Sequence, residues 1–158
     1  YMHALSDEQF VPFMQPILRA HGIETTDERA GKAAGIMKER ASFINDLWDL
    51  TSYFFVAPTE YDEKQVKKYW KGENPARLAE LRELLAAIED FSLENTEAIV
   101  TAWIQEKGYG MGQIMNSLRL ALVGAGKGPG MFDVTSFLGQ EECLKRIDYL
   151  LTNLKPIE

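Results

Sequence analysis

Residues 74–88 read NPARLAELRELLAAI, and this stretch carries the pattern that decides the fold. Asn74 is suited to capping free N–H groups at a helix start, and Pro75 fits the first helical turn, where its missing N–H is not needed. The apolar side chains that follow recur at the three- and four-residue spacing of one helical face. They are Leu78, Leu81, Leu84, Leu85 and Ile88. The stretch therefore predicts an amphipathic helix.

Helical spacing recurs on both sides of this stretch. Apolar stripes of the same kind run through residues 10–18, 44–55, 96–103, 111–122 and 144–151. Ser6 with Gln9, and Thr25 with Glu28, have the spacing of capping boxes at helix starts. We find no alternating strand pattern, no repeat of fixed period and no low-complexity tract in the sequence. These features predict an all-α fold.

The length of 158 residues suits one medium domain or two small helical ones that share an interface. The best candidate for a border is the polar stretch Lys71-Gly72-Glu73-Asn74. We therefore expect two helical subdomains, over residues 1–72 and 73–158.

Composition argues against several classes of function. A formal net charge of −7 is not that of a strongly basic nucleic-acid binder, so a polyanion would have to meet a local patch of Lys and Arg. Cys143 is the single cysteine, which excludes a disulfide framework within one chain and fits a reducing cytosol. No apolar run approaches the roughly 20 residues of a membrane span, and no signal pattern opens the chain. Tyr1 precedes Met2, which suggests a piece of a longer protein.

No group of residues in the sequence points to catalysis. His3 and His21 are far apart and have no cysteine or paired carboxylates nearby at ligand spacing, so we predict neither a catalytic residue nor a metal site. The glycine-rich stretch 124–130 resembles a nucleotide-binding phosphate loop only superficially. It has no preceding strand pattern and no Gly-Lys-Ser/Thr ending.

Two arginines and the glycine-rich stretch suggest a binding surface instead. Arg119 interrupts the apolar run 118–123, where a charge must be paired or must emerge at a surface. Arg40 stands on the edge of another apolar stripe, and for both arginines a structural ion pair is the plainer alternative. Stretch 124–130 would let the backbone approach an unstacked base that an arginine fork could also contact, although a flexible connector is the alternative here.

Two blocks of sequence resemble the C-terminal region of bacterial glutamyl-tRNA synthetases. The first is MNSLRLALVG at 115–124, followed by GPGMFD at 128–133 and LGQE at 138–141. That family typically has Pro-Leu-Arg-x-Ala-Leu-Thr-Gly, a short loop, Pro-Gly-Leu-Phe, and Leu-Gly-Lys-Glu before its final helix. The second block is KERA at 38–41, with Asp46-Leu47 and Tyr53-Phe54-Phe55 after it. It resembles the family's Lys-Glu-Arg-Ala helix, its Glu-Leu and its closing aromatic pair.

The resemblance implies a pair of helical anticodon-binding subdomains that form a cage around the tip of a tRNA. The implied partner is tRNA(Glu), with no DNA and no membrane. The parent enzyme is expected to be a monomeric, cytoplasmic glutamate–tRNA ligase that uses ATP with Mg. Catalytic motifs similar to His-Ile-Gly-His and Lys-Met-Ser-Lys-Ser do not occur in this chain. The chain itself is therefore expected to contribute tRNA binding and not the activation of glutamate.

The resemblance also assigns roles to individual residues. Arg119 matches the arginine that contacts the first anticodon base, and Arg40 matches the arginine that reads the third. Gly128, Pro129 and Met131 match positions that pack against the first and middle bases. Because Gly128 stands where a side chain often supplies a polar contact, the middle base would be met there by backbone.

Lysines could supply phosphate contacts on an otherwise acidic chain. Lys64, Lys67 and Lys68 fall on one face of an expected short helix, and Lys127 lies in the glycine-rich stretch. A merely solvated face is the alternative for these lysines. Splayed bases are bound largely by stacking and edge hydrogen bonds, so anticodon recognition does not require a strongly basic protein.

The main alternative to RNA recognition is an acidic helical protein-interaction module with no RNA partner. RNA recognition predicts that Arg40, Arg119 and residues 126–131 converge on one concave surface, within the roughly 20 Å span of three nucleotides. An interaction module predicts no such convergence.

Overall fold

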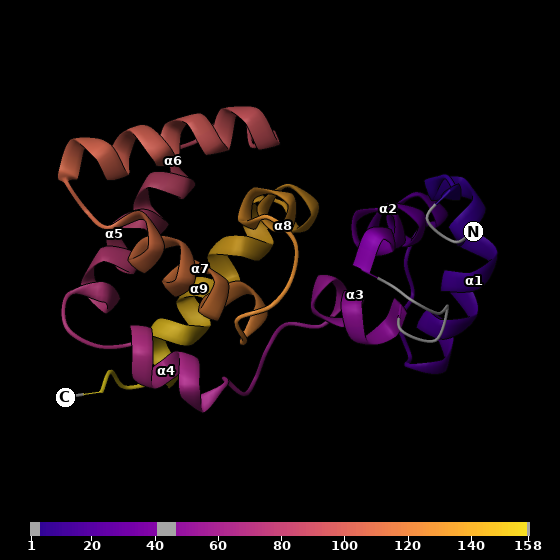
Figure 1. The fold of residues 1–158 in the computed structure, drawn as a ribbon, viewed down its shortest axis with the longest axis horizontal. Coiled ribbons are helices and arrows are strands. Elements are labelled where there is room, and N and C mark those ends of the chain that lie inside the picture. Colours follow the sequence, from indigo (N-terminus) through magenta and orange to yellow (C-terminus); the bar gives the residue numbers. More distant parts are fainter. Residues whose placement is uncertain (1–3, 41–46, 158) are drawn as a thin grey trace. The chain divides into compact units, whose positions relative to one another are not determined.

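The computed structural model describes residues 4–40 and 47–157, and most of this part of the chain is helical (Figure 1). The α-helices are α1 (Asp7–Ala20), α2 (Asp27–Met37), α3 (Leu47–Phe55), α4 (Glu63–Tyr69), α5 (Asn74–Ala86), α6 (Leu93–Lys107), α7 (Met111–Val123), α8 (Met131–Leu138) and α9 (Gln140–Asn153). A 3-10 turn spans Lys38–Arg40. No strand occurs within the described ranges, so the all-α prediction is confirmed. None of the described helices combines the length and apolar composition needed to cross a bilayer.

Side-chain caps begin the first two helices. Gln9 N–H donates to Ser6 Oγ at 3.3 Å and Ser6 N–H donates to Gln9 Oε1 at 2.8 Å, which confirms the predicted capping box of α1. At α2 the cap is Thr26, which accepts from Arg29 N–H at 3.2 Å. The expectation of Thr25 as the cap is wrong by one residue, because it is Thr26 that has the extended backbone preceding the helix.

The start of α5 differs from the sequence expectation in a similar way. Pro75 lies in the first turn as predicted, but Asn74 does not cap the helix. Its amide donates instead to Tyr69 O at 2.7 Å and to Gln113 Oε1 at 2.8 Å. Asn74 is already the first helical residue, and the N-cap position falls on Glu73. The Asn74 side chain instead joins the end of α4 to the start of α7.

The chain divides into two compact units, residues 1–56 and 57–158. The short helix α4 belongs to the second unit through Trp70, which is buried. The Trp70 indole N–H donates to Leu154 O at 2.9 Å, and Ile157 N–H donates to Trp70 O at 2.9 Å. These bonds tie the residues after α9 to α4. The border between RNA-binding subdomains expected after Gly72 remains a prediction.

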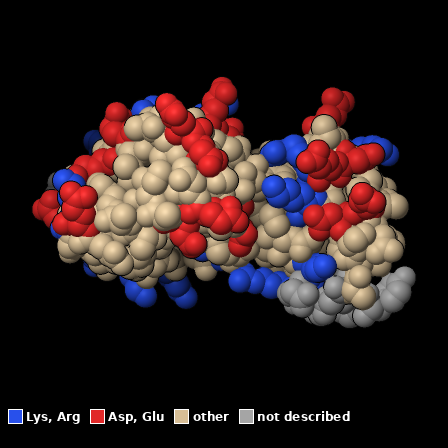
Figure 2. Space-filling view, turned by 90° about the horizontal axis from the view of Figure 1, so that it is seen from above, with Lys and Arg blue, Asp and Glu red and all other residues tan. Residues whose placement is uncertain are grey.

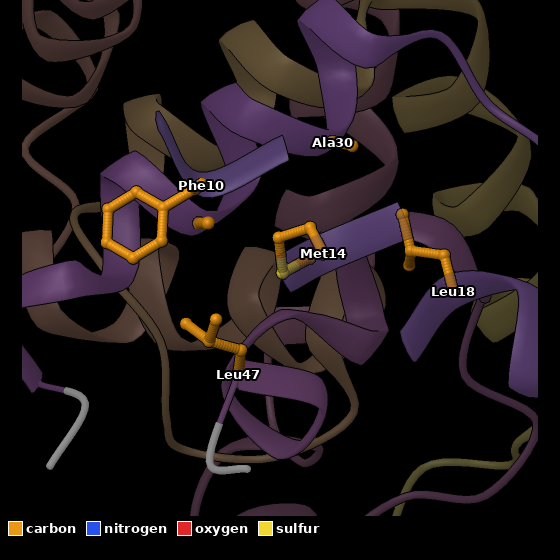
Figure 3. Close-up of a cluster of buried hydrophobic side chains, with 6 residues drawn as sticks. Phe10, Met14, Leu18, Ala30 and Leu47 are labelled. Carbon is orange, nitrogen blue, oxygen red and sulfur yellow. The ribbon is translucent and has the colours of Figure 1, made fainter. Parts of the chain in front are cut away.

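The first unit is built from α1, α2 and α3 around a small apolar core. Figure 3 shows Phe10, Met14 and Leu18 from α1 in a row between Ala30 and Leu47. Within this unit α1 and α2 approach closely, because Gly31 carries no side chain. A Cβ at Gly31 would overlap the main-chain oxygen of Asp7.

In the second unit α7 and α9 pack against each other and against both α5 and α8, with α6 on α5 and α8 and with α4 on α7 (Figure 1). Its core is formed by residues of every helix from α5 to α9. Fully or almost fully buried side chains include Leu78, Leu81, Leu85, Val100, Ile104, Ile114, Leu118, Val134, Ile147 and Leu150. This core holds the end of α7 and the start of α8 in place, with the glycine-rich stretch between them.

Candidate functional site

Arg119 lies in the C-terminal half of α7, between two buried leucines, and is itself half-buried. The helix ends at Val123, and Gly124 then adopts a left-handed conformation, with φ +84°, that reverses the chain. The reversal brings the following loop back toward the helix, and Arg119 Nη1 donates to Lys127 O at 3.0 Å. The guanidinium is therefore placed at the glycine-rich loop.

The loop of residues 124–130 is anchored at its start by the segment that precedes α4. Asp62 N–H donates to Gly124 O at 2.8 Å. A Cβ on Gly124 would lie 2.8 Å from Pro58 Cβ and 2.9 Å from Glu60 O, so the two backbones are in direct contact. These contacts and the hydrogen bond from Arg119 to Lys127 O fix the position of the first half of the loop. They disfavour the alternative that the loop is a flexible connector.

The second half of the loop leads directly into α8. Gly128 has φ +112° and is half-buried, whereas Pro129 and Met131 are buried. No side chain caps α8, whose N-cap residue is Gly130. In the first turn of α8 the Asp133 and Val134 N–H groups donate to Gly130 O, at 3.0 Å and 3.3 Å. The surface available here is therefore mainly backbone, because the Pro129 and Met131 side chains face the protein.

Arg40 is exposed and ends the 3-10 turn of the first unit, whereas Arg119 belongs to the second unit. The convergence of Arg40, Arg119 and residues 126–131 on one surface remains a prediction.

The candidate phosphate-binding lysines are exposed. Lys64, Lys67 and Lys68 lie on α4, and Lys127 lies in the loop. Helix α4 packs against α7, so its lysines and the loop belong to one region of the second unit. On the face seen in Figure 2, acidic and basic side chains are interspersed over the molecule. Any positive surface for RNA would be local, as the net charge predicts.

Sequence reasoning missed Arg146, which is only 3% exposed. Its Nε contacts Glu142 Oε2 at 2.7 Å, and its Nη1 donates to Leu122 O at 2.8 Å. A signal was available, because Arg146 occupies an apolar-stripe position of α9 together with Cys143, Ile147 and Leu150. A charge at such a position must find partners, and here one of them is a carbonyl in the last turn of α7.

Of the cysteine and the two histidines in the sequence, Cys143 and His21 lie within the described ranges. Burial raises the pKa of the Cys143 thiol to about 12, so the thiolate needed of a nucleophile is disfavoured at neutral pH. His21 is the C-cap residue of α1, and its ring stacks on the Trp48 ring with the two centroids 3.8 Å apart. His3 lies outside the described residues. Within the described ranges, no group of three or more His, Cys, Asp or Glu side chains could hold a metal ion.

Comparison with known proteins gives a consistent result. Residues 8–151 match the anticodon binding domain family. The chain is 52% identical over 155 residues to a glutamate–tRNA ligase of Phocaeicola vulgatus and 50% identical over 155 residues to one of Bacteroides fragilis. Each match covers 98% of this chain and 31% of the relative, so the chain spans about a third of the length of these relatives.

A solved structure agrees with these relatives. The crystal structure of a glutamate tRNA ligase from Elizabethkingia meningosepticum, in complex with its amino acid, superposes with a TM-score of 0.91 at 37% sequence identity. The superposition covers 98% of this chain and 31% of that one. The helical arrangement described above is therefore similar to that of a segment of a longer ligase.

Proposed function

Because the chain belongs to the anticodon binding domain family, we propose that it binds the anticodon of tRNA(Glu) as the C-terminal part of a glutamate–tRNA ligase. One observation supports this most directly. Arg119 Nη1 lies 3.0 Å from the carbonyl oxygen of Lys127, within the glycine-rich loop of residues 124–130. A planar donor and exposed backbone are thus brought together, and single-stranded bases are commonly recognised by groups of this kind.

In this proposal Arg119 contacts the first anticodon base, and the backbone at Gly128 meets the edge of the first or middle base. Pro129 and Met131 are buried, so their side chains pack in the protein interior and fix the position of the loop backbone. Arg40, on the first unit, reads the third base. An arginine fork can donate two hydrogen bonds to a base, which gives it specificity as well as charge.

The proposal is compatible with a net charge of −7. Lys64, Lys67, Lys68 and Lys127 would neutralise phosphates beside the loop, and base contacts would supply the discrimination. Contacts to the rest of the tRNA would come from the remainder of a protein about three times as long, judged by its relatives. The use of ATP with Mg, the attachment of glutamate and a cytoplasmic location are proposed for that whole protein, together with a monomeric state.

The test is a competition assay with anticodon stem–loop RNAs of tRNA(Glu), each altered at one anticodon base. Anticodon recognition predicts that the native sequence binds best and that a change at the first base weakens binding. Arg119→Ala should remove the preference at the first base, at a loss of about 1–3 kcal/mol in binding free energy. Arg19→Ala, an exposed position on α1, is the matched control. Equal binding of every RNA would refute the proposal and favour a protein-interaction module.

A further inference from the structure

We propose that Gln65 of α4 is a further specificity-determining residue, whose carboxamide hydrogen-bonds the nucleotide that docks against the turn at residues 126–128. This inference rests on the anticodon-binding function proposed above and deepens it. It adds a side chain from a helix to which that proposal gives only phosphate contacts.

The Gln65 carboxamide lies directly against Gly126. A Cβ at Gly126 would stand 2.7 Å from Gln65 Nε2 and 3.1 Å from Gln65 Oε1. The space that a side chain at position 126 would fill is thus taken by a carboxamide from α4. Both polar atoms of that group lie at the turn, with no side chain of residue 126 in between.

A carboxamide and a guanidinium therefore contact neighbouring residues of the same turn. Gln65 meets Gly126, and Arg119 Nη1 donates to Lys127 O at 3.0 Å. The segment that delivers Gln65 is itself fixed to the loop, because Asp62, the N-cap residue of α4, donates its N–H to Gly124 O at 2.8 Å. The two planar groups are thus positioned together by the second unit.

No described residue occupies the hydrogen-bonding groups of this carboxamide, although Gln65 is only partly exposed. A carboxamide brings two N–H donors and an oxygen acceptor, and on a partly exposed side chain these groups can exchange water for a ligand. A group of this kind beside an RNA-binding turn retains its donors and acceptor for the ligand.

The chemistry of the carboxamide points to a nucleotide. Donor and acceptor lie side by side on the amide, and a base edge presents the same pair in reverse, so that two hydrogen bonds can form. A ribose 2′-hydroxyl would use one of them. Exposed Lys64 and Lys68 lie one residue before and three residues after Gln65, so a phosphate of the same nucleotide would meet positive charge.

The test measures the Kd of the chain for the anticodon stem–loop of tRNA(Glu), by fluorescence anisotropy and, for weak complexes, by NMR titration. Gln65→Met keeps the side-chain length and removes both polar atoms, and we expect it to raise Kd roughly tenfold. Gln65→Glu keeps the shape but replaces the donor by a negative charge, so it should weaken binding at least as much. Gln105→Met, at an exposed position of α6, is the matched control and should leave Kd unchanged.

Two sets of modified RNA distinguish the atoms that Gln65 contacts. In one set a single loop nucleotide carries another base, and in the other it carries a 2′-deoxyribose. At the nucleotide that Gln65 contacts, the RNA change weakens binding to the native chain but has little further effect on Gln65→Met. If Gln65 hydrogen-bonds a base edge, the effects of Gln65→Met and of the base change on the binding free energy are not additive. If it hydrogen-bonds the 2′-hydroxyl, the effects of Gln65→Met and of the deoxyribose are not additive.

The inference fails if the native chain discriminates among the RNAs and Gln65→Met, with an unchanged unfolding midpoint, binds each RNA with the same Kd as the native chain. That outcome leaves the proposed function intact. If the native chain does not discriminate among the RNAs, both the proposed function and this inference are wrong. Should Gln65→Met not fold, Gln65→Leu, which also removes both polar atoms and adds no charge, is used for the same comparison.

Discussion

The guanidinium of Arg146 donates a hydrogen bond to the main-chain oxygen of Leu122 at 2.8 Å. A buried cation on α9 thus supplies a donor to a carbonyl in the last turn of α7. The same side chain contacts Glu142 Oε2 at 2.7 Å. The glycine-rich loop begins two residues after Leu122. Arg146 therefore supports the end of the helix from which the candidate RNA-binding loop departs, while its own side chain is withdrawn from the surface.

We expect Arg146→Met to destabilise the chain by about 2–4 kcal/mol. The substitution roughly preserves the volume of the side chain, but it leaves the Glu142 carboxylate without its partner and the Leu122 carbonyl without its donor. Urea denaturation followed by circular dichroism measures the loss. Arg82→Met is the control, because the Arg82 pairs with Asp148 and Glu83 lie at the surface and should contribute little. Equal effects of the two variants would show that burial of Arg146 is not what makes its contacts strong.

Gly124→Ala should destabilise the second unit by about 2–4 kcal/mol, from two causes. An alanine at φ +84° is strained, and its Cβ would stand 2.8 Å from Pro58 Cβ. Gly108 ends α6 with a similar φ of +71°, but a Cβ there would meet no atom within 4 Å, so Gly108→Ala should show the strain alone, about 1–2 kcal/mol. The difference between the two variants in urea denaturation isolates the contact with Pro58, and no difference would mean that the loop gives way.

These two glycines illustrate what the sequence could predict. The spacing of apolar residues predicted the all-α fold, and a glycine just after an apolar stripe is a local signal for the end of a helix. Gly108 is the C-cap residue of α6, and Gly124 is the C-cap residue of α7. The contact of Gly124 with Pro58 could not be predicted, since it joins segments more than sixty residues apart along the chain. Nothing in the local sequence of either segment signals the other.

The candidate site shows the same limit. The position of Arg119 in an apolar run and the glycines of 124–130 suggested that they act together, and the bond from Arg119 to Lys127 joins them. Gln65 gave no such signal, because a glutamine on a short polar helix is ordinary. The prediction of Asn74 as a cap was wrong because the helix begins at Asn74 itself, and the Asn74 amide donates to two partners from other segments, which the local rule does not include.

Gly31→Ala should lower the stability of the first unit by about 1–3 kcal/mol, because the new methyl group meets the backbone oxygen of Asp7, which cannot rotate away. Gly112→Ala is the matched control on α7, where a Cβ meets no atom within 4 Å. That substitution should be neutral or stabilise by up to about 1 kcal/mol, because alanine has the higher helix propensity. Thermal denaturation of both variants measures the effects. A neutral Gly31→Ala would indicate that α1 can move away from α2.

Cys143 should make the protein less stable at alkaline pH. Burial raises the pKa of its thiol from 9.0 to about 12, so above about pH 9 the unfolded chain loses this proton while the folded chain keeps it. Fewer protons bound in the unfolded state means that the free energy of unfolding falls as pH rises, by up to about 1.4 kcal/mol per pH unit. Urea denaturation at several pH values measures the slope. Cys143→Ala should lack the part of this pH dependence that begins near pH 9. An unchanged pH dependence in the variant would mean that other groups cause it, such as Tyr61, whose pKa is also raised by burial to about 12.

Arg40→Gln should reduce discrimination at the third anticodon base while leaving discrimination at the first base intact. Glutamine retains hydrogen-bonding groups but loses the charge and the fork of the guanidinium, so the preference at one position should relax by roughly tenfold. Arg119→Lys, which keeps the charge and loses the fork, should show the reverse pattern, with the first base affected and the third unaffected. Competition among stem–loop RNAs altered at single anticodon positions measures both. Because the two arginines belong to different compact units, this pair of results would require both units to contact one RNA. A loss of Arg40 that weakened all RNAs equally would instead assign Arg40 a structural role.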